Sequence, residues 1–199
     1  MPSSAALAEF MCSHIPITPS VRVVEIGAGT GRLTQALLKN GLSPQNLCII
    51  ELDPAMYNFL CQNFPHVTII QGNACHLSQL LPESWFGAVD CIVSGIPMVN
   101  LSFENQSQII QACLGTLSPQ GKILQFTYGP LSPLPSRKLG LSQKRLGHVL
   151  MNFPPATVWQ YTKAVSPSGG RKISRIKDLK QQSLKQFQRL KKHPFNNNF

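Results

Sequence analysis

The stretch VVEIGAGTGRLTQALL, residues 23–38, decides the expected fold. An apolar run contains one acid, Glu25, and is followed by glycines at positions 27, 29 and 31 and then by a helical pattern. In such a strand–turn–helix unit, the first glycine permits a tight turn and the second lets a ligand approach the backbone. The third lets helix and strand pack closely. The alternative is a purely structural turn.

Short apolar runs alternate with helix-length segments over the first 128 residues. Each run is apolar on both faces, as buried parallel strands must be, and the alternation indicates an open α/β sheet with helices on both sides. The expected strands are Val21–Ile26, Leu47–Leu52, Val67–Gln71, Ala88–Ser94 and Lys122–Tyr128, and the expected helices cover residues 30–40, 54–63, 76–81 and 103–117. The proline-rich segment GPLSPLPS, residues 129–136, then leads to a late addition to this sheet.

Charge is unevenly distributed along the 199 residues, whose formal net charge is +10. Residues 163–199 carry ten Lys or Arg against one acid, whereas residues 1–162 carry eight against seven. We therefore predict a nearly neutral domain over residues 1–165 and a basic tail over residues 166–199. No apolar run approaches the roughly 20 residues that span a bilayer. The six scattered cysteines, without a CxxC motif, predict a reducing compartment and neither a structural metal nor disulfides.

A second acid strengthens the ligand-binding interpretation of the glycines. Glu51 lies twenty residues beyond Gly31, near the end of the second expected strand, where a carboxylate accepts hydrogen bonds from both ribose hydroxyls. With EIGAGTG at residues 25–31, the chain resembles the class I S-adenosylmethionine-dependent methyltransferases. The resemblance implies a Rossmann-like sheet, mostly parallel with an antiparallel edge, and S-adenosylmethionine as the cofactor, with S-adenosylhomocysteine as its product.

The same resemblance implies the residues that contact the cofactor. In the family, the glycine-rich turn contacts the methionine part, and the residue at Asn73 is often Asp and reads the adenine. An Asn carbonyl still accepts from the exocyclic amine. The implied contacts are Glu25, Gly27, Ala28, Gly29, Gly31, Glu51, Leu52, Asn73, Ala74, Ser94 and Gly95.

The segment after the fourth expected strand indicates the methyl acceptor. Methyltransferases that modify nucleobase amines carry an amide or acid, then proline and an aromatic residue here, whereas this chain has Ser94-Gly95-Ile96-Pro97-Met98. The strings PSSAALAEFM (2–11), IVSGIPMVNLS (92–102), ILQFTYGPLSP (123–133) and NFPPATVWQY (152–161) resemble bacterial phospholipid N-methyltransferases, which convert phosphatidylethanolamine to phosphatidylcholine. The first half of the chain also resembles the ribosomal RNA adenine dimethyltransferases.

This second resemblance implies a lipid amine as the acceptor and names the catalytic candidates. Aromatic faces attract a methylated ammonium by ~0.5–2 kcal/mol per ring. The candidate rings are Phe126, Tyr128, Phe153 and Trp159. We assign the lipid phosphate to the Tyr128 hydroxyl and to Arg145. Arg145 is one of four basic residues at 137–145 that are expected above the carboxyl edge of the sheet. We assign the amine proton to His148. The alternatives are that the rings pack in the core, that the basic residues lie in a solvated loop, and that His148 is structural.

The tail predicts an anionic membrane surface as a partner. Residues 171–192 place an apolar stripe between Lys and Arg on a helical wheel, a pattern typical of helices that lie on membranes. RNA is disfavoured because Phe187 is the segment's single aromatic residue, and a packed terminal helix is the alternative. The similar lipid enzymes carry further residues before the PSS helix, so attachment is expected to rest on the tail. The predicted enzyme methylates phosphatidylethanolamine at the cytoplasmic membrane face; an RNA adenine methyltransferase or an inactive membrane-binding relative are the alternatives.

Overall fold

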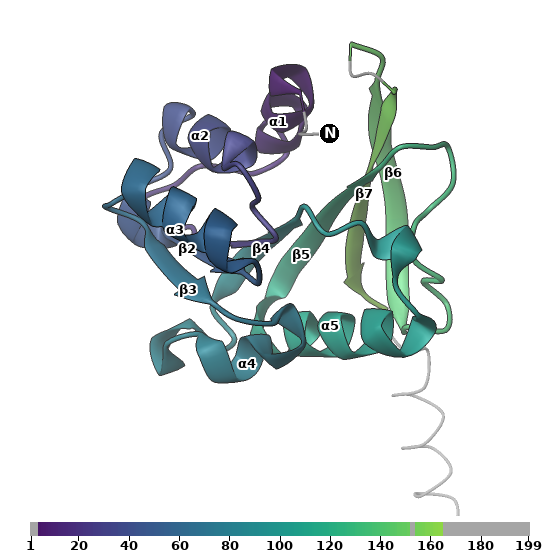
Figure 1. Ribbon diagram of the computed structural model, residues 1–199. Coiled ribbons are helices and arrows are strands. Elements are labelled where there is room, and N and C mark those ends of the chain that lie inside the picture. The colour runs from purple at the N-terminus through teal and green to yellow at the C-terminus, as the bar shows by residue number, and fades with distance from the viewer. Residues whose placement is uncertain (1–3, 152–153, 165–199) are drawn as a thin grey trace, which may run out of the picture. The chain divides into compact units, whose positions relative to one another are not determined.

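The computed structural model describes residues 4–151 and 154–164, which form a seven-stranded sheet with helices on both faces (Figure 1). The strand order is β3-β2-β1-β4-β5-β7-β6, and β7 runs in the opposite direction to the other six described strands. The predicted Rossmann-like sheet, mostly parallel with an antiparallel edge, is thus confirmed. The strands are β1 Val23–Ile26, β2 Leu47–Glu51, β3 Thr68–Gln71, β4 Val89–Ser94, β5 Leu117–Thr127, β6 Leu141–Val149 and β7 Ala156–Lys163.

Helices and strands agree with the predicted segments within a few residues, except at the start of β5. This strand begins at Leu117 instead of Lys122, because the segment directly after α5 already pairs with Val89 of β4. The helices are α1 Ala5–Cys12, α2 Arg32–Lys39, α3 Pro54–Asn63, α4 Leu77–Leu80 and α5 Phe103–Thr116. The predicted tail, residues 166–199 with its segment 171–192, lies outside the described residues, as does Phe153. The domain boundary at residue 165 therefore stays a prediction.

Local chemistry sets the ends of α2 and α3. Gly41 follows α2 with a φ of 93°, and the Leu42 N–H then donates to the Leu37 carbonyl at 3.1 Å, which closes the helix. Pro54 occupies the first position of α3, where its missing N–H costs nothing, and the Asp53 carboxylate caps that helix. The ends of both helices are therefore set by residues next to them in the sequence.

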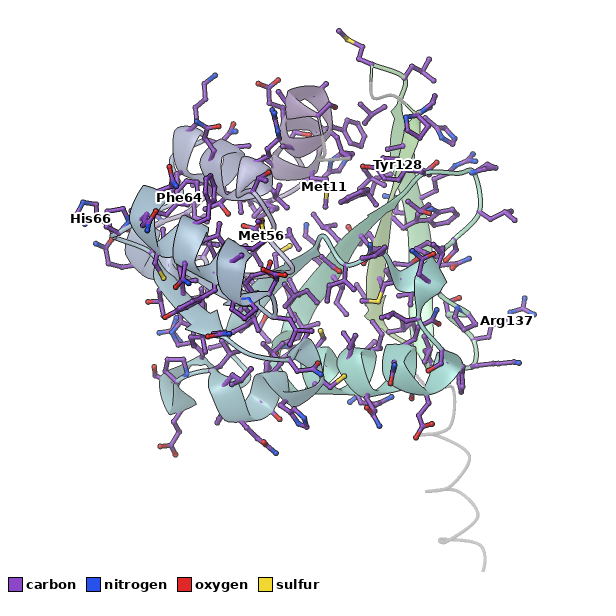
Figure 2. The ribbon with its side chains drawn as sticks, in the orientation of Figure 1. Met11, Met56, Phe64, His66, Tyr128 and Arg137 are labelled. Carbon is purple, nitrogen blue, oxygen red and sulfur yellow. The ribbon has the colours of Figure 1, made fainter. Side chains whose placement is uncertain are left out.

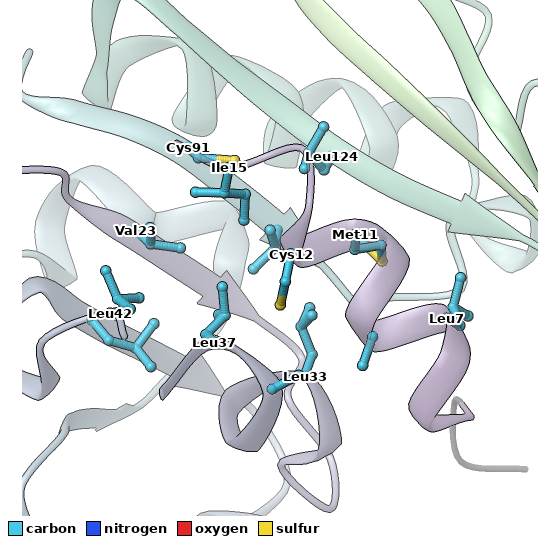
Figure 3. Close-up of a cluster of buried hydrophobic side chains, with 14 of the residues drawn as sticks. Leu7, Met11, Cys12, Ile15, Val23, Leu33, Leu37, Leu42, Cys91 and Leu124 are labelled. Atoms are coloured by element: carbon cyan, nitrogen blue, oxygen red, sulfur yellow. The ribbon is translucent and has the colours of Figure 1, made fainter. Parts of the chain in front are cut away.

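The two faces of the sheet are covered by different helices (Figure 1). One core layer joins α1, α2 and α3 to the sheet, and the other joins α4 and α5. Figure 3 shows the first layer, where Cys12 of α1 points toward Leu33 and Leu37 of α2. Burial raises the pKa of the Cys12 thiol to about 12, so this cysteine fills space and does not react. None of the described helices is long and apolar enough to cross a bilayer.

The connection between β5 and β6 corrects one expectation. Because β7 is antiparallel to both neighbours, β6 runs in the direction of β5, and residues 128–140 return the chain from the carboxyl end of β5 to the amino end of β6. The Leu141 N–H donates to the Ser136 carbonyl at 2.9 Å, which holds this turn at the start of β6. Arg137 and Lys138 therefore precede the amino end of β6 and do not stand above the carboxyl edge; Figure 2 shows Arg137 far from Tyr128.

Candidate active site

The carboxyl ends of β1 and β4 meet through two glycines. Gly27 has a φ of 69°, and its N–H donates to the Ile50 carbonyl of β2 at 2.9 Å. A Cβ on Gly95 would lie 2.3 Å from the Gly27 carbonyl oxygen, and a Cβ on Gly27 would lie 2.8 Å from the Ile96 side chain. Only glycine lets these two backbones approach so closely. Gly27 and Gly95 line two cavities, one on each side of them.

The other two glycines of the turn have different surroundings. Gly29 has a φ of 56° and nothing within 4 Å of its Cβ position, so it presents bare backbone to open space. Gly31, with a φ of 72°, would place a Cβ 2.4 Å from the Phe64 ring and 3.0 Å from Leu60. The second glycine thus has the open surroundings that its predicted role requires. The third allows close packing as expected, but against α3 and its C-terminal residue instead of the preceding strand.

A cavity of about 500 Å³ lies over the ends of β1, β2 and β4 and has Glu51 in its wall. Glu51 Oε2 accepts from the Gly29 N–H at 2.9 Å, and Oε1 accepts from the Asp53 N–H at 3.0 Å. A carboxylate has about four acceptor sites, so two remain for the hydroxyls of a ribose. The hydrogen bonds also fix the turn to the second strand, which the sequence pattern did not indicate.

The far end of this cavity is suited to a flat heterocycle. Leu52 lies at the mouth of this cavity and is 63% exposed, and Ala74 is buried in the cavity wall. The Asn73 side-chain oxygen accepts from the Cys75 N–H at 2.9 Å and has a second lone pair for an amine. Sequence reasoning missed Asn105 and Gln108 of α5, which also line the cavity; their three-residue spacing near the helix start was the available signal.

A second cavity, of about 280 Å³, opens on the other side of Gly27, Gly29 and Gly95. Glu25 is completely buried in its wall and accepts a 2.6 Å hydrogen bond from the Thr34 hydroxyl. Burial raises the pKa of Glu25 to about 7; the Thr34 hydrogen bond lowers this pKa and the charge of Glu51 raises it. A buried carboxylate without a cation gains greatly from an ammonium group, such as that of a methionine moiety.

The walls of this smaller cavity come from elements far apart in the sequence. Met11 of α1, Met56 of α3 and Phe126 of β5 line it together with Ala28, and Figure 2 shows Met11 and Met56 on the helical side with Tyr128 beyond them. The two methionines were not among the predicted site residues, because helical segments alone do not reveal which turn faces a ligand. Of the predicted cofactor contacts, Gly31 and Ser94 line neither cavity. Gly31 packs against α3 instead, and Ser94 is buried at the end of β4, where its hydroxyl accepts from the Ile96 N–H at 3.3 Å.

The three catalytic candidates lie on two faces of the sheet. Tyr128 is 42% exposed and packs edge-on against Phe126, with ring centroids 5.5 Å apart, on the α1 side. Arg145 pairs with Trp159, whose ring packs in the α5 layer, and His148 pairs with Thr157 on that same side. The structure thus places Tyr128 beside the smaller cavity, and it does not bring Arg145 or His148 to it.

His148 takes part in a short hydrogen-bond relay. The Thr157 hydroxyl donates to the Gly129 carbonyl at 2.6 Å, so its oxygen accepts from His148 Nδ1 at 2.9 Å. This arrangement puts the proton of the neutral ring on Nδ1 and leaves Nε2 as an acceptor. The relay joins the loop after β5 to the β6–β7 pair.

Known proteins are similar to this chain in both sequence and fold. A family profile described as a methyltransferase domain matches residues 23–121. The chain is 28% identical over 132 residues to an ornithine lipid N-methyltransferase of Singulisphaera acidiphila, covering 65% of this chain and 69% of that protein. It is 31% identical over 148 residues to ribosomal RNA small subunit methyltransferase A of Porphyromonas gingivalis, covering 65% of this chain but only 54% of that protein.

Solved structures show the same architecture at low identity. A TehB-like S-adenosylmethionine-dependent methyltransferase from Corynebacterium glutamicum has a TM-score of 0.57 at 17% identity, covering 78% of this chain and 87% of that chain. The YcgJ protein from Bacillus subtilis has a TM-score of 0.59 at 14% identity, covering 80% of this chain and 98% of that chain. The site supplies an acid for an ammonium, bare backbone at Gly29 and an acid for a ribose, which together fit the cofactor. This chain belongs to the class I S-adenosylmethionine-dependent methyltransferases.

Proposed function

We propose that this enzyme methylates the primary amine of a membrane lipid, with phosphatidylethanolamine as the acceptor. The observation that carries the proposal is the similarity, over 132 residues, to an ornithine lipid N-methyltransferase. Phosphatidylethanolamine and an ornithine lipid both present a primary amine beside acyl chains, so the transfer chemistry is the same for either. The amine nitrogen forms a bond to the methyl carbon, the carbon–sulfur bond breaks, and the ammonium product loses a proton to water or to a base.

The loop after β4 supports a lipid over a nucleobase. A base amine would need an acceptor and a stacking ring at this loop. Here the Ser94 hydroxyl accepts from the Ile96 N–H, and Met98 is buried with its carbonyl bound by Gln106 Nε2 at 2.8 Å. Neither residue presents an amide or an aromatic face to an extruded base.

The acceptor side of the smaller cavity has the surface that a methylated amine favours. Phe126 lines the cavity, and Tyr128 extends the same aromatic surface toward solvent. The cationic product gains from such rings by ~0.5–2 kcal/mol each. Positioning of the amine against the cofactor then supplies the main rate enhancement. The Tyr128 hydroxyl remains our candidate for the lipid phosphate.

The acceptor is tested by methyl transfer from radiolabelled S-adenosylmethionine. Phosphatidylcholine vesicles containing phosphatidylethanolamine, an ornithine lipid or no primary amine are compared with undermodified ribosomal RNA, and Glu51→Ala serves as the cofactor-binding control. We expect label in the phosphatidylethanolamine fraction. Label in the ornithine lipid alone would keep the class and change the acceptor, whereas label in RNA would overturn the proposal.

A further inference from the structure

Exposed large apolar side chains concentrate on one edge of the described sheet. Of nine such residues among those described, six follow the carboxyl end of a strand: Leu52, Val99, Tyr128, Leu131, Leu150 and Met151. The other three are Phe59 on α3, Phe86 just before β4, and Phe103 at the start of α5, whose ring lies beside Lys138. Single exposed apolar residues are ordinary on protein surfaces, but a group gathered at one edge marks an interaction site.

Four of these residues follow the carboxyl ends of β5 and β6, which lie on either side of the start of β7, and we call them the rim: Tyr128, Leu131, Leu150 and Met151. Tyr128 and Leu131 belong to the loop after β5, and Leu150 and Met151 to the turn between β6 and β7. The Thr157 hydroxyl, near the start of β7, donates to the Gly129 carbonyl of the loop after β5. Figure 1 shows the upper ends of β6 and β7 projecting beyond this loop. Leu150 is 78% exposed and Met151 is 87% exposed, so neither side chain supports the fold.

The charge of the surrounding chain is one-sided. Residues 105–164 carry six Lys or Arg and no Asp or Glu, while residues 1–104 carry three against seven. The rim therefore belongs to the half of the domain that is purely cationic, and Lys144 and Arg145 are exposed on the strand that leads to its turn. Exposed apolar side chains on a cationic part of the chain suit the interface of an anionic bilayer, with headgroups near the cations and acyl chains near the apolar side chains.

We propose that the rim inserts into an anionic membrane surface and holds the acceptor side of the smaller cavity against the headgroups. The surface acts in addition to the tail, and it deepens the proposed function without requiring a particular acceptor lipid. Tyr128 packs on Phe126, which lines the cavity, so an inserted rim brings lipid headgroups to the entrance of the site. A lipid amine then reaches the methyl group without leaving the bilayer.

The test is flotation of the full chain on vesicles of phosphatidylcholine and phosphatidylglycerol, which contain no primary amine. The variant Leu150→Ser/Met151→Ser is compared with wild type and with Phe86→Ser, a matched exposed apolar residue before the amino end of β4. We expect the double variant to lower the partition coefficient at least about tenfold, equivalent to about 1.4 kcal/mol, and Phe86→Ser to leave it unchanged. At about 0.5 M salt the Debye length is on the order of 4 Å, so the electrostatic attraction of the tail is screened. We expect the difference in partition coefficient between wild type and the double variant to persist at this salt concentration.

Each outcome bears on the rim independently of the acceptor. Equal flotation of all three proteins, or no flotation of wild type, would overturn the proposal. Dimerisation of wild type that the double variant abolishes, with flotation unchanged, would assign the rim to a second copy of the chain. Cofactor affinity and the unfolding temperature must stay those of wild type in the double variant, because both side chains are exposed. Failure of lipid methylation alone leaves the flotation result, and hence this proposal, intact.

Discussion

Replacing Glu25 by Gln isolates the electrostatic cost of the cofactor site. Glu25 is buried beneath the glycine-rich turn, where the Thr34 hydroxyl donates to its carboxylate. The substitution keeps the side chain's size and an oxygen for Thr34, and it removes the charge. The protein without cofactor should therefore become more stable at alkaline pH, although a residue of the site has been changed.

The magnitude follows from the pKa of Glu25, which burial raises from 4.5 to about 7. A tenfold change in an equilibrium is about 1.4 kcal/mol, so an ionised Glu25 lowers the free energy of unfolding by about 3 kcal/mol at pH 8. Because the raised pKa belongs to the folded state, the folded protein binds the extra proton. Stability from this group is complete below pH 4.5 and is lost as the pH rises to about 7.

The assay is urea unfolding of wild type, Glu25→Gln and the control Glu9→Gln between pH 5 and pH 8. Glu9 is an exposed acid on α1, so its substitution changes the charge equally and should alter stability by less than about 0.5 kcal/mol. We expect Glu25→Gln to match wild type near pH 5 and to exceed it by about 3 kcal/mol at pH 8, or by roughly 6–12 °C in unfolding temperature. A difference that does not vary with pH would refute the placement of a titrating Glu25 in this site.

Cofactor binding should remove the stability advantage that Glu25→Gln has over wild type at alkaline pH. The ammonium of S-adenosylhomocysteine restores the charge balance around Glu25, so its affinity for wild type should rise as the pH increases toward 7 and Glu25 becomes ionised. Glu25→Gln should bind the ligand about 10- to 100-fold more weakly at pH 8, because a buried charge has lost its partner. Titration calorimetry measures both effects, and equal affinities for the two proteins would mean that the ammonium binds elsewhere.

Three further changes test other parts of the site. Glu51→Ala should weaken S-adenosylhomocysteine binding at least about tenfold by calorimetry, since the ribose contact and the anchor of Gly29 are lost together; unchanged affinity would contradict the nucleoside's placement. Gly31→Ala should lower the unfolding temperature more than Gly29→Ala does, because its methyl would overlap the Phe64 ring, whereas Gly29→Ala should mainly weaken cofactor binding. Deleting residues 168–199 should reduce binding to anionic vesicles and leave cofactor affinity unchanged; loss of both would make the tail part of the fold.

The cofactor half of the site was predictable because its determinants are local. A buried strand, three alternate glycines and a helix specify one turn, and the acid twenty residues later ends the adjacent strand. The pairing of β1 with β2 then brings Glu51 to Gly29 without any further information. Packing decides what the pattern leaves out, such as Met11 and Met56 in the smaller cavity.

The acceptor half was harder to predict because its determinants are not local. Arg145 and His148 are three residues apart and would face opposite sides of a regular strand. An irregularity between Arg145 and Gly147 shifts the register, so both pair with odd-numbered residues of β7 and face the α5 layer. Hydrophobic alternation does not reveal such a bulge. It also does not reveal that β7 lies between β5 and β6, which separates Arg145 from Tyr128.

The acidic residues of the domain and most of its basic residues lie in different halves of the chain. The strands on one side of β4 carry Glu25 and Glu51, and their half of the chain holds seven of the domain's acids. The strands on the other side belong to the half without any acid. Under our proposals, a cationic cofactor would be attracted to the first half and an anionic membrane to the second, so the same charge division would also orient the domain on a bilayer. Gly95, at the end of β4 and in the walls of both cavities, lies where the two halves meet, and this is where the proposed reaction would bring a lipid amine to the methyl group.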